Sequence, residues 1–492
     1  MLSVISEEAE DSAGTADVPL GGGYLNYTTT IRSELEDFIE REGLNLSQLG
    51  RKAGLNAGTV SSILKGNRIM AVDQLDRMTK VLDLPEGYYY EQYIQECIVE
   101  TVPNWRRIRP FLFRCAELDS PDCIRRSVQL LLDNLTYSPL LFEVAEEFFT
   151  AGKHKAAVIL YESVAASERR QHSERLAFCQ YRLFTLRLGD NQERNLQAAL
   201  QFEPFVDRLD ETDQLDALRE LANTYKSLQR WDKVDEIAEE LGTKAKIQLE
   251  LVSKPRHKRD EPKKKLKRPL FVYLTFSYLL RGSVCDARGA YEEALQYAYK
   301  YVDLSWVKDR DDETQKWVEL YEGWSKANIF VCRLLLGEKD IIADYLAFID
   351  QDEDEILIGI LNIVKAANRF DFKINHILEK YKSRVLHYGT LQPESIGIYT
   401  HQIIAEESTL CFYELAYYYL WNGNYSEGFT YLLYGLVKAD SINNEPRILS
   451  FVRLFERFRD YASFDIQLEY QNLMKKEIGK NEKKSSGVVS GK

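Results

Sequence analysis

Residues 43 to 72 read GLNLSQLGRKAGLNAGTVSSILKGNRIMAV, and this stretch decides the fold. Apolar residues recur at helical spacing on both sides of Gly54. The stretch contains four cations and no acidic residue, although the whole chain of 492 residues has a formal net charge of −13. It therefore predicts two short helices that meet at a tight turn and carry a local basic surface.

Residue types at the helix ends support this prediction. Asn45 is expected to cap the first helix, with Gln48 three residues later in the reciprocal capping position. Gly54 is expected to end that helix, and Asn56 to cap the second. The inward-facing residues are predicted to be Leu46, Leu49, Gly50, Ala53, Val60, Ile63 and Leu64.

The other face of the second helix is small and polar and ends in a cation. A helix that enters the DNA major groove needs such a face, with cations at its rim for phosphates. The alternative interpretation is an ordinary helical hairpin with a solvated basic face. The predicted DNA-binding residues are Arg51, Lys52, Ala57, Gly58, Thr59, Ser61, Ser62, Lys65 and Arg68.

These residues have different predicted roles. Gly58, Ser61 and Ser62 are candidates for close approach to bases or backbone, and Thr59, Lys65 and Arg68 for phosphate contact. Arg51 and Lys52 lie at the end of the preceding helix, where phosphate contact and plain solvation fit the sequence equally well.

The stretch resembles the helix-turn-helix of the Cro and phage-repressor family. The matching residues are Gly54 at the turn, Val60 and Ile63 in the core, and Ser61, Leu64, Gly66 and Arg68 at the exit of the second helix. Gly50 replaces the alanine usual in the family, which keeps a small residue but weakens the helix by about 1 kcal/mol. The resemblance implies a double-stranded DNA operator, read by a dimer as two half-sites.

Bulk properties favour a soluble, cytoplasmic protein. The seven cysteines are scattered singly, without a CxxC pair, as expected of reduced core residues. The first residues are acidic, so no secretory signal is predicted. Apolar runs such as residues 270 to 280 are much shorter than the roughly 20 residues of a membrane span, and no membrane association is expected.

No catalytic site is predicted. The six histidines are dispersed, without HExxH or paired metal-ligand spacing, and no phosphate-binding glycine loop follows a strand. Paired carboxylates such as Glu146 and Glu147 lie where a solvated helix face would place them. We therefore expect neither an enzyme nor a cofactor.

Beyond the basic stretch, long amphipathic helical patterns dominate and strand-like alternation is absent. A loose two-helix repeat recurs at residues 142–164, 176–200, 221–241, 276–302, 327–349, 360–381 and 412–439. Its turns lie about 33 to 60 residues apart, near or above the tetratricopeptide period of 34. The predicted fold is all-α, with a helix-turn-helix domain followed by a tetratricopeptide-like α-solenoid superhelix that has a concave inner surface.

The predicted domain organisation follows from these patterns. It comprises a flexible leader (1–26), the helix-turn-helix domain (27–90), N-terminal repeats with a connector helix (91–253), a basic loop (254–269), C-terminal repeats (270–475) and a polar tail (476–492). The basic loop is interpreted as a solvated connection between the two sets of repeats. The alternative is an additional arm that contacts phosphates.

The whole chain resembles the RRNPP family of cytoplasmic receptors in Gram-positive bacteria. Residues 104–135, NWRRIRPFLFRCAELDSPDCIRRSVQLLLDNL, are similar to the opening of the repeat domain in such regulators, including those of phages. The resemblance implies a homodimeric transcription factor controlled by a short signalling peptide. It does not imply whether the peptide promotes or releases DNA binding.

Helical geometry suggests where such a peptide would bind. If Gln229, Gly337, Asn368 and Gly423 mark the inter-helix turns, residues six positions earlier face the concave surface, and these are Asn223, Asn362 and Tyr417. Asn328 lies one helical turn before the equivalent position. Asparagine can both donate to and accept from an extended peptide, and members of the family use asparagines in this way.

Each of these residues also has a structural interpretation. The asparagines could instead cap or bridge adjacent helices. Trp324, Tyr413 and Tyr417 could form apolar pockets for the ligand's side chains, but aromatic residues at this spacing usually belong to the core.

Peptide binding is predicted to alter the pitch of the superhelix or its dimer contacts, and thereby the spacing of the two DNA-reading domains. Two other functions remain open. The repeats could bind and inhibit a partner protein, or the chain could be a dimeric repressor without a small ligand.

Overall fold

The computed structural model describes residues 30–169, 173–189, 191–252, 266–308, 311–351, 355–390 and 401–486. Within these ranges all regular elements are helices and no strand is present, so the predicted all-α class is confirmed. None of the helices in these ranges is both long and apolar enough to cross a lipid bilayer. The predicted leader, residues 254–265 of the basic loop and residues 487–492 of the tail lie outside the described residues.

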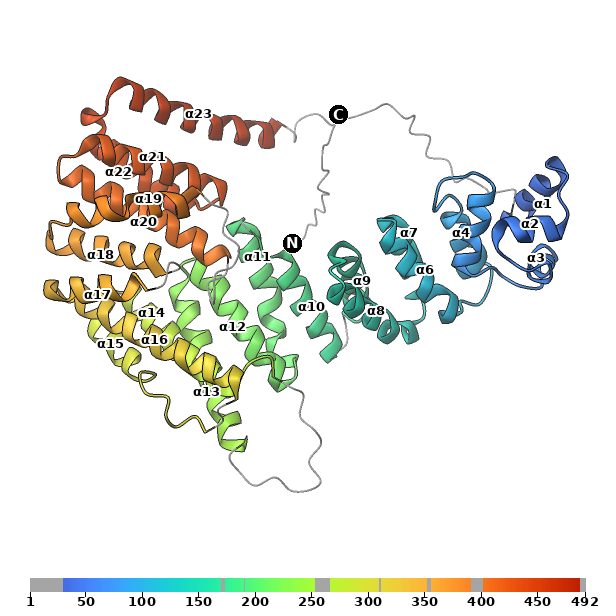
Figure 1. Ribbon diagram of the computed structural model, residues 1–492, viewed down its shortest axis with the longest axis horizontal. Coiled ribbons are helices and arrows are strands. Elements are labelled where there is room, and N and C mark those ends of the chain that lie inside the picture. The colour runs from blue at the N-terminus through green and yellow to red at the C-terminus, as the bar shows by residue number, and fades with distance from the viewer. Residues whose placement is uncertain are drawn as a thin grey trace, which may run out of the picture. The chain divides into compact units, whose positions relative to one another are not determined.

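The chain divides into two compact units, Met1–Tyr137 and Ser138–Lys492 (Figure 1). The helices of the first unit are α1 (Ile31–Arg41), α2 (Leu46–Ala53), α3 (Ala57–Leu64), α4 (Val72–Val81), α5 (Tyr90–Ile94), η1 (Gln95–Val99), α6 (Trp105–Glu117), α7 (Pro121–Leu131) and η2 (Leu135–Tyr137). α2 packs against both α3 and α4, and α1 packs against α3.

The ends of α2 and α3 form as their residue types predict. The Asn45 side chain accepts a hydrogen bond from the Gln48 backbone at 2.9 Å, and the Gln48 side chain accepts one from the Asn45 backbone at 2.8 Å. Gly54 ends α2 in the left-handed conformation, with φ of +65°. Asn56 then caps α3 by accepting from the Thr59 backbone at 2.7 Å. These local contacts position the predicted DNA-reading face of α3.

The backbone packs so closely at position 50 that only glycine fits there, and even alanine is too large. A Cβ atom at this position would lie 2.6 Å from the Leu55 carbonyl oxygen, which belongs to the α2–α3 connection. A methyl group therefore cannot fit unless the backbone moves. The departure from the alanine of the Cro-like pattern has a local structural cause.

We expect Gly50→Ala to destabilise the first unit by about 1 kcal/mol. The substitution gains about 1 kcal/mol of helix propensity, but overpacking against a backbone atom costs about 2 kcal/mol. Thermal unfolding of the full-length protein measures the difference. Gly58→Ala is the matched control, because its Cβ would lie 3.4 Å from its nearest neighbour, the Asn56 side chain, and it should not destabilise. A stabilised Gly50→Ala protein would contradict this packing argument.

The aromatic segment after α4 belongs to the core of the first unit. Tyr89, Tyr90 and Tyr93 are each about 2% exposed. Their hydroxyl groups donate to earlier parts of the unit: Tyr89 to Glu34 at 2.8 Å, Tyr90 to Asp76 at 2.9 Å and Tyr93 to the Met70 carbonyl at 2.9 Å. The segment predicted as a connector helix thus forms α5 and η1 and packs with the helices that precede it.

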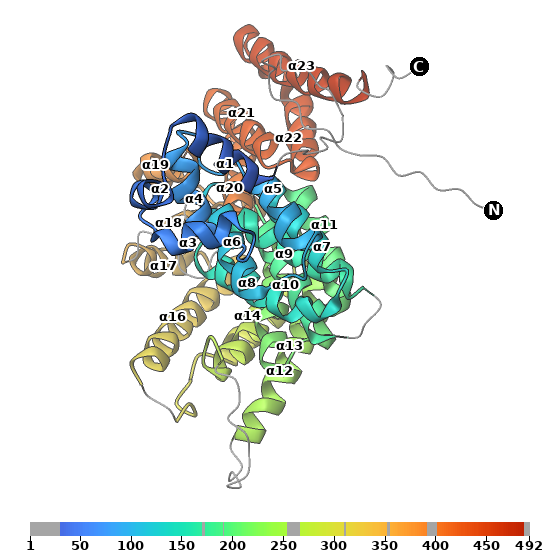
Figure 2. The ribbon, with the colours of Figure 1, turned by 90° about the vertical axis from the view of Figure 1, so that its right-hand side faces the viewer.

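The helices of the second unit follow one another in chain order, and successive helices pack together, as α13 does with α14 and α20 with α21 (Figures 1 and 2). They are α8 (Ser138–Thr150), α9 (His154–Ser167), α10 (Glu174–Arg187), α11 (Gln192–Phe202), η3 (Glu203–Arg208), α12 (Glu211–Ser227), α13 (Trp231–Val252), α14 (Leu270–Ala287), α15 (Tyr291–Tyr299), α16 (Asp312–Leu335), η4 (Lys339–Ile341), α17 (Ile342–Ile349), α18 (Ile356–Phe370), α19 (Asn375–Thr390), α20 (His401–Trp421), α21 (Tyr425–Ser441), α22 (Glu445–Phe458), η6 (Arg459–Tyr461) and α23 (Phe464–Ser486).

Three of the four predicted inter-helix turns are present. Gln229, Gly337 and Gly423 all have positive φ angles directly after a helix. The turn assigned to Asn368 is wrong, because α18 continues to Phe370 and ends at Asp371, with φ of +55°. Aspartate tolerates this conformation better than most residues, and the Asn368 side chain instead donates to the Glu414 carbonyl oxygen at 2.9 Å.

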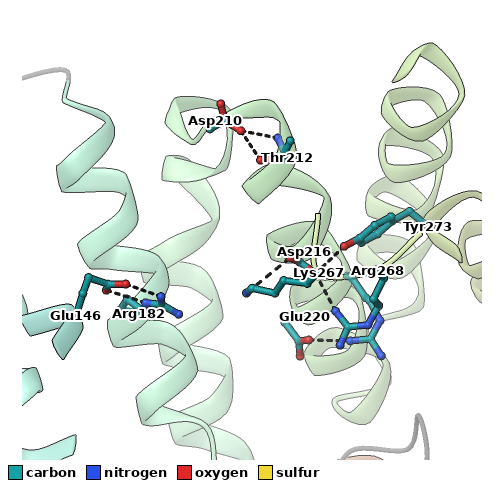
Figure 3. A network of polar contacts seen from close by, with 10 residues as sticks. Glu146, Arg182, Asp210, Thr212, Asp216, Glu220, Lys267, Arg268 and Tyr273 are labelled. Atoms are coloured by element: carbon teal, nitrogen blue, oxygen red, sulfur yellow. Dashed lines mark hydrogen bonds and ion pairs between the residues drawn. The ribbon is translucent and has the colours of Figure 1, made fainter. Parts of the chain in front are cut away.

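A buried carboxylate anchors the segment that enters α14. Asp216 on α12 accepts from Arg268 at 2.8 Å and from the Tyr273 hydroxyl at 2.9 Å, and Lys267 approaches it at 3.6 Å (Figure 3). The Asp216 side chain is only 5% exposed. The last residues of the predicted basic loop are therefore fixed to α12.

We expect Asp216→Asn to destabilise the second unit by about 2 kcal/mol, because the partly buried Arg268 loses its charged acceptor. The midpoint of thermal unfolding should fall. Asp232→Asn is the matched control, since Asp232 also pairs with an arginine, Arg288, but its side chain is 99% exposed. Equal midpoints for the two variants would show that the Asp216 cluster adds nothing beyond a surface ion pair.

Candidate functional site

The predicted DNA-binding residues all reach the surface of the first unit. Arg51, Lys52, Gly58, Lys65 and Arg68 are exposed, and Ala57, Thr59, Ser61 and Ser62 are half-buried. None of the four cations forms an ion pair with another residue in the described part of the chain. Their charge is therefore available to an anionic partner such as a phosphate backbone.

Two further cations lie beside this surface and are not indicated by the sequence pattern. The Arg77 guanidinium on α4 donates to the carbonyl of Gly54 at 3.2 Å, directly at the α2–α3 turn. A Cβ built on Gly66 would lie 2.5 Å from Arg32, so the α1 guanidinium lies next to the end of α3. Arg32 precedes residues 43–72 and Arg77 follows them. The spacing of residues within that stretch therefore could not indicate that either arginine lies beside the basic surface.

The second unit contains a pocket of about 290 Å³. It is lined by residues of α12, α13, α14, α15, α16, α18, α20 and α22, together with the turn after α12 and Tyr301 after α15. Asn328 and Asn362 are among its lining residues, so two of the predicted peptide-binding residues share one cavity. The Asn328 side chain donates to the Tyr301 hydroxyl at 2.9 Å, which fixes the orientation of its amide.

The other four predicted peptide-binding residues do not line this pocket. Asn223 is buried on α12, and Trp324 is 8% exposed with its ring 5.0 Å from that of Tyr321. Tyr417 stacks on Trp421 at 4.8 Å. Tyr413 packs edge-on against Phe451 at 5.5 Å. The structural interpretation of these aromatic residues, as packing residues, agrees with these contacts.

The pocket crosses successive helices at different heights, which explains this division. On α12 it includes Lys226, three residues before the turn at Gln229, whereas on α20 it reaches only Glu407 and Leu410, far from the turn at Gly423. Residues six positions before the turns of α12 and α20 therefore lie outside the pocket. Asn328 and Asn362 are each nine residues before the observed turns at Gly337 and Asp371.

Charged side chains gather in the pocket, and no sequence pattern indicates this. Lys226 and Lys365 interact electrostatically with Asp286 and Glu407. Burial lowers the pKa of Lys226. Burial also disfavours charge on Lys365, but its 3.1 Å ion pair with Asp286 and the nearby Glu407 raise its pKa overall. In the sequence these residues are typical of solvated helix faces.

A buried carboxylate joins parts of the second unit that are distant in sequence. Glu406 on α20 accepts from Gln229 after α12, from Asn444 before α22, and from Arg447 on α22 at 2.7 Å. Burial raises the pKa of Glu406, against the opposing effect of Arg447. We call Glu406, Gln229, Asn444 and Arg447 the Glu406 latch. Gln229 and Arg447 also line the pocket, so the latch borders this cavity.

Three buried side-chain atoms at or beside the pocket have no hydrogen-bond partner among the described residues. They are the Nδ2 atom of Asn223, the Oδ1 atom of Asp286 and the Nε atom of Arg447. Asp286 and Arg447 line the pocket, and Asn223 lies one helical turn before Lys226. A buried polar atom without a partner costs roughly 1–3 kcal/mol, so their grouping here is typical of a binding site.

Comparison with known proteins does not indicate a function, so the candidate sites are identified from the structure alone. No protein-family model matches the chain, and no curated protein matches it. The candidate sites are therefore the basic surface of α2 and α3 and the polar pocket of the second unit.

Proposed function

We propose that the chain is a sequence-specific DNA-binding transcriptional regulator whose second unit binds a short signalling peptide. In this proposal α2 and α3 form a helix-turn-helix, and the second unit is a tetratricopeptide-like solenoid. The observation that carries the proposal is the exposed α3 face with Lys65 and Arg68 at its end, bordered by Arg51 and Lys52, in a chain that is acidic overall. Local cations without internal partners are what phosphate contact requires.

Other features support a receptor role for the second unit. Its pocket combines two asparagine amides with charged groups, and amides of this kind can pair with a peptide main chain. The proposed regulator acts as a homodimer on two half-sites. It acts in the cytoplasm, where its DNA lies, and its seven cysteines are all free thiols, as a reducing compartment requires.

The function is tested with the full-length protein and a random duplex DNA library. Selection should enrich one sequence, most simply an inverted repeat, and its affinity should fall steeply with salt. Affinity for that DNA is then measured with and without short peptides encoded beside the gene. A change in DNA affinity supports the receptor proposal.

The alternatives give different results in the same experiment. A protein that enriches one DNA sequence but never responds to peptide would be a ligand-independent repressor. A protein that enriches no sequence and instead forms a stable complex with another protein would be an inhibitory scaffold. Either result would overturn the proposal.

A further inference from the structure

The pocket of the second unit has donors that lack an acceptor. The Lys226 side chain forms no direct ion pair or hydrogen bond with any described residue, although it lies in the pocket and burial lowers its pKa. The Nη2 group of Arg447 donates a hydrogen bond to Glu406 at 2.7 Å, but the buried Nε atom of Arg447 has no hydrogen-bond partner among the described residues. These donors come from α12 and α22 and line one cavity.

The two other cationic contacts near this cavity are already satisfied. Lys365 pairs with Asp286 at 3.1 Å, and the Nη2 atom of Arg447 belongs to the Glu406 latch. A buried amine is stable when an anion compensates its charge. Lys226 is attracted by Glu407 and Asp286, but no carboxylate contacts its ammonium group directly within the described residues. The group that fits this position is an anion that contacts Lys226 and also accepts from the Arg447 Nε atom.

The pocket also has acceptors that lack a donor. The Oδ1 atom of Asp286 is buried without a partner among the described residues. Glu407 lines the same cavity, and its side chain forms no direct ion pair or hydrogen bond within the described part of the chain, although it attracts Lys226 and Lys365 electrostatically. A simple anion would leave these acceptors unsatisfied and would be repelled by both carboxylates. The ligand group must carry an N–H donor close to its negative charge.

The last residue of a peptide has this combination, since its carboxylate lies next to its own amide N–H. The cavity of about 290 Å³ is at the lower limit of pockets that hold a complete drug-sized ligand, roughly 300 Å³. It has room for the end of a short peptide and not for all of it. Capture of a terminal carboxylate is a known mode of peptide recognition.

We propose that this pocket binds the carboxyl-terminal residue of a peptide, with the carboxylate held by Lys226 and the Nε atom of Arg447 and the amide N–H donated to Asp286 or Glu407. Asn328 and Asn362, which line the same cavity, contact the preceding main chain. The inference rests on the proposed peptide-receptor function and adds which end of the peptide is recognised. It also gives a role to the charged residues of the pocket.

The test uses two libraries of N-acetylated pentapeptides with random sequences. One library has free carboxyl termini and the other has carboxyl-terminal amides. Each is passed over immobilised full-length protein, and the retained peptides are quantified by mass spectrometry. We expect the wild-type protein to retain free acids at least about tenfold better than amides, because a carboxamide can accept a hydrogen bond from Lys226 but carries no negative charge to pair with it.

A variant and a matched control identify the residue responsible. Lys226→Gln should abolish the preference for free acids, whereas Lys326→Gln, at an exposed lysine of α16 outside the pocket, should keep it. The comparison of acids with amides on the wild-type protein does not depend on whether the variant folds.

Each other outcome has a defined meaning. Equal retention of acids and amides would overturn the inference and leave the peptide receptor intact. So would enrichment of Asp or Glu side chains in both libraries, which would assign the pocket to a side-chain carboxylate. A preference that persists in Lys226→Gln would overturn the assignment of the carboxylate to that lysine. Retention of neither library would overturn the peptide-receptor proposal as well, while DNA selection would still report on the first unit.

Discussion

Replacement of both Lys65 and Arg68 by alanine is expected to lower the affinity of the full-length protein for its selected DNA by about tenfold or more. The two side chains are exposed after the end of α3 and form no ion pair within the described residues. Each is expected to bind one phosphate, and removal of each cation should reduce the salt slope by about 1. A plot of log affinity against log salt should thus become shallower by about 2.

The matched control removes the same types of charge elsewhere in the first unit. Lys80 on α4 and Arg106 on α6 are cations outside α2 and α3. Their double alanine variant should change the salt slope little, because non-specific long-range attraction is screened beyond about 8–10 Å. If both double variants reduced affinity equally, the binding would reflect general charge and not the α3 surface. An unchanged slope for the Lys65 and Arg68 variant would remove these residues from the DNA interface.

The second large effect concerns the asparagines of the pocket. Asn328→Ala and Asn362→Ala should each weaken binding of a peptide retained from the free-acid library by about tenfold, because each leaves a peptide polar group without its partner. The double variant should weaken binding by about a hundredfold if the two asparagines act independently. Calorimetry with the full-length protein measures both affinity and stoichiometry.

Asn424→Ala is the control for these variants. Asn424 is an exposed residue before α21, and its side chain does not cap that helix. Its removal should leave peptide affinity unchanged. Wild-type affinity in the Asn328 and Asn362 double variant would show that the peptide binds another part of the second unit, even if the terminal carboxylate still required Lys226. Thermal unfolding of each variant separates weaker binding from weaker folding.

Sequence patterns predict the features that depend on near neighbours. The caps of α2 and α3, at Asn45 and Asn56, and the left-handed end of α2 at Gly54 form as expected, because each involves residues within about one helical turn. Three inter-helix turns are also correct. The fourth is wrong because Asn368 and Asp371 are both residue types that end helices, and Asn368 is held inside α18 by its tertiary contact with Glu414.

The polar content of the pocket cannot be predicted in the same way. Lys226, Lys365 and Glu407 come from α12, α18 and α20, and each has the appearance of a solvated residue within its own helix. These three side chains lie together only because the pocket crosses each helix at a different position along its length. A sequence repeat of irregular length does not specify those positions. Glycine at position 50 likewise requires knowledge of the Leu55 carbonyl, which the helix pattern does not contain.

The Glu406 latch restricts how this chain can change its length. In an open array each repeat touches only its neighbours, so a helix pair can be inserted or deleted while the remainder keeps its packing. Here Gln229 and Glu406 must meet across 177 positions of sequence. Insertion or deletion of a pair between them would separate the two side chains and remove one wall of the cavity. The lining of this cavity is therefore expected to change in evolution by substitution of side chains and not by duplication of helices.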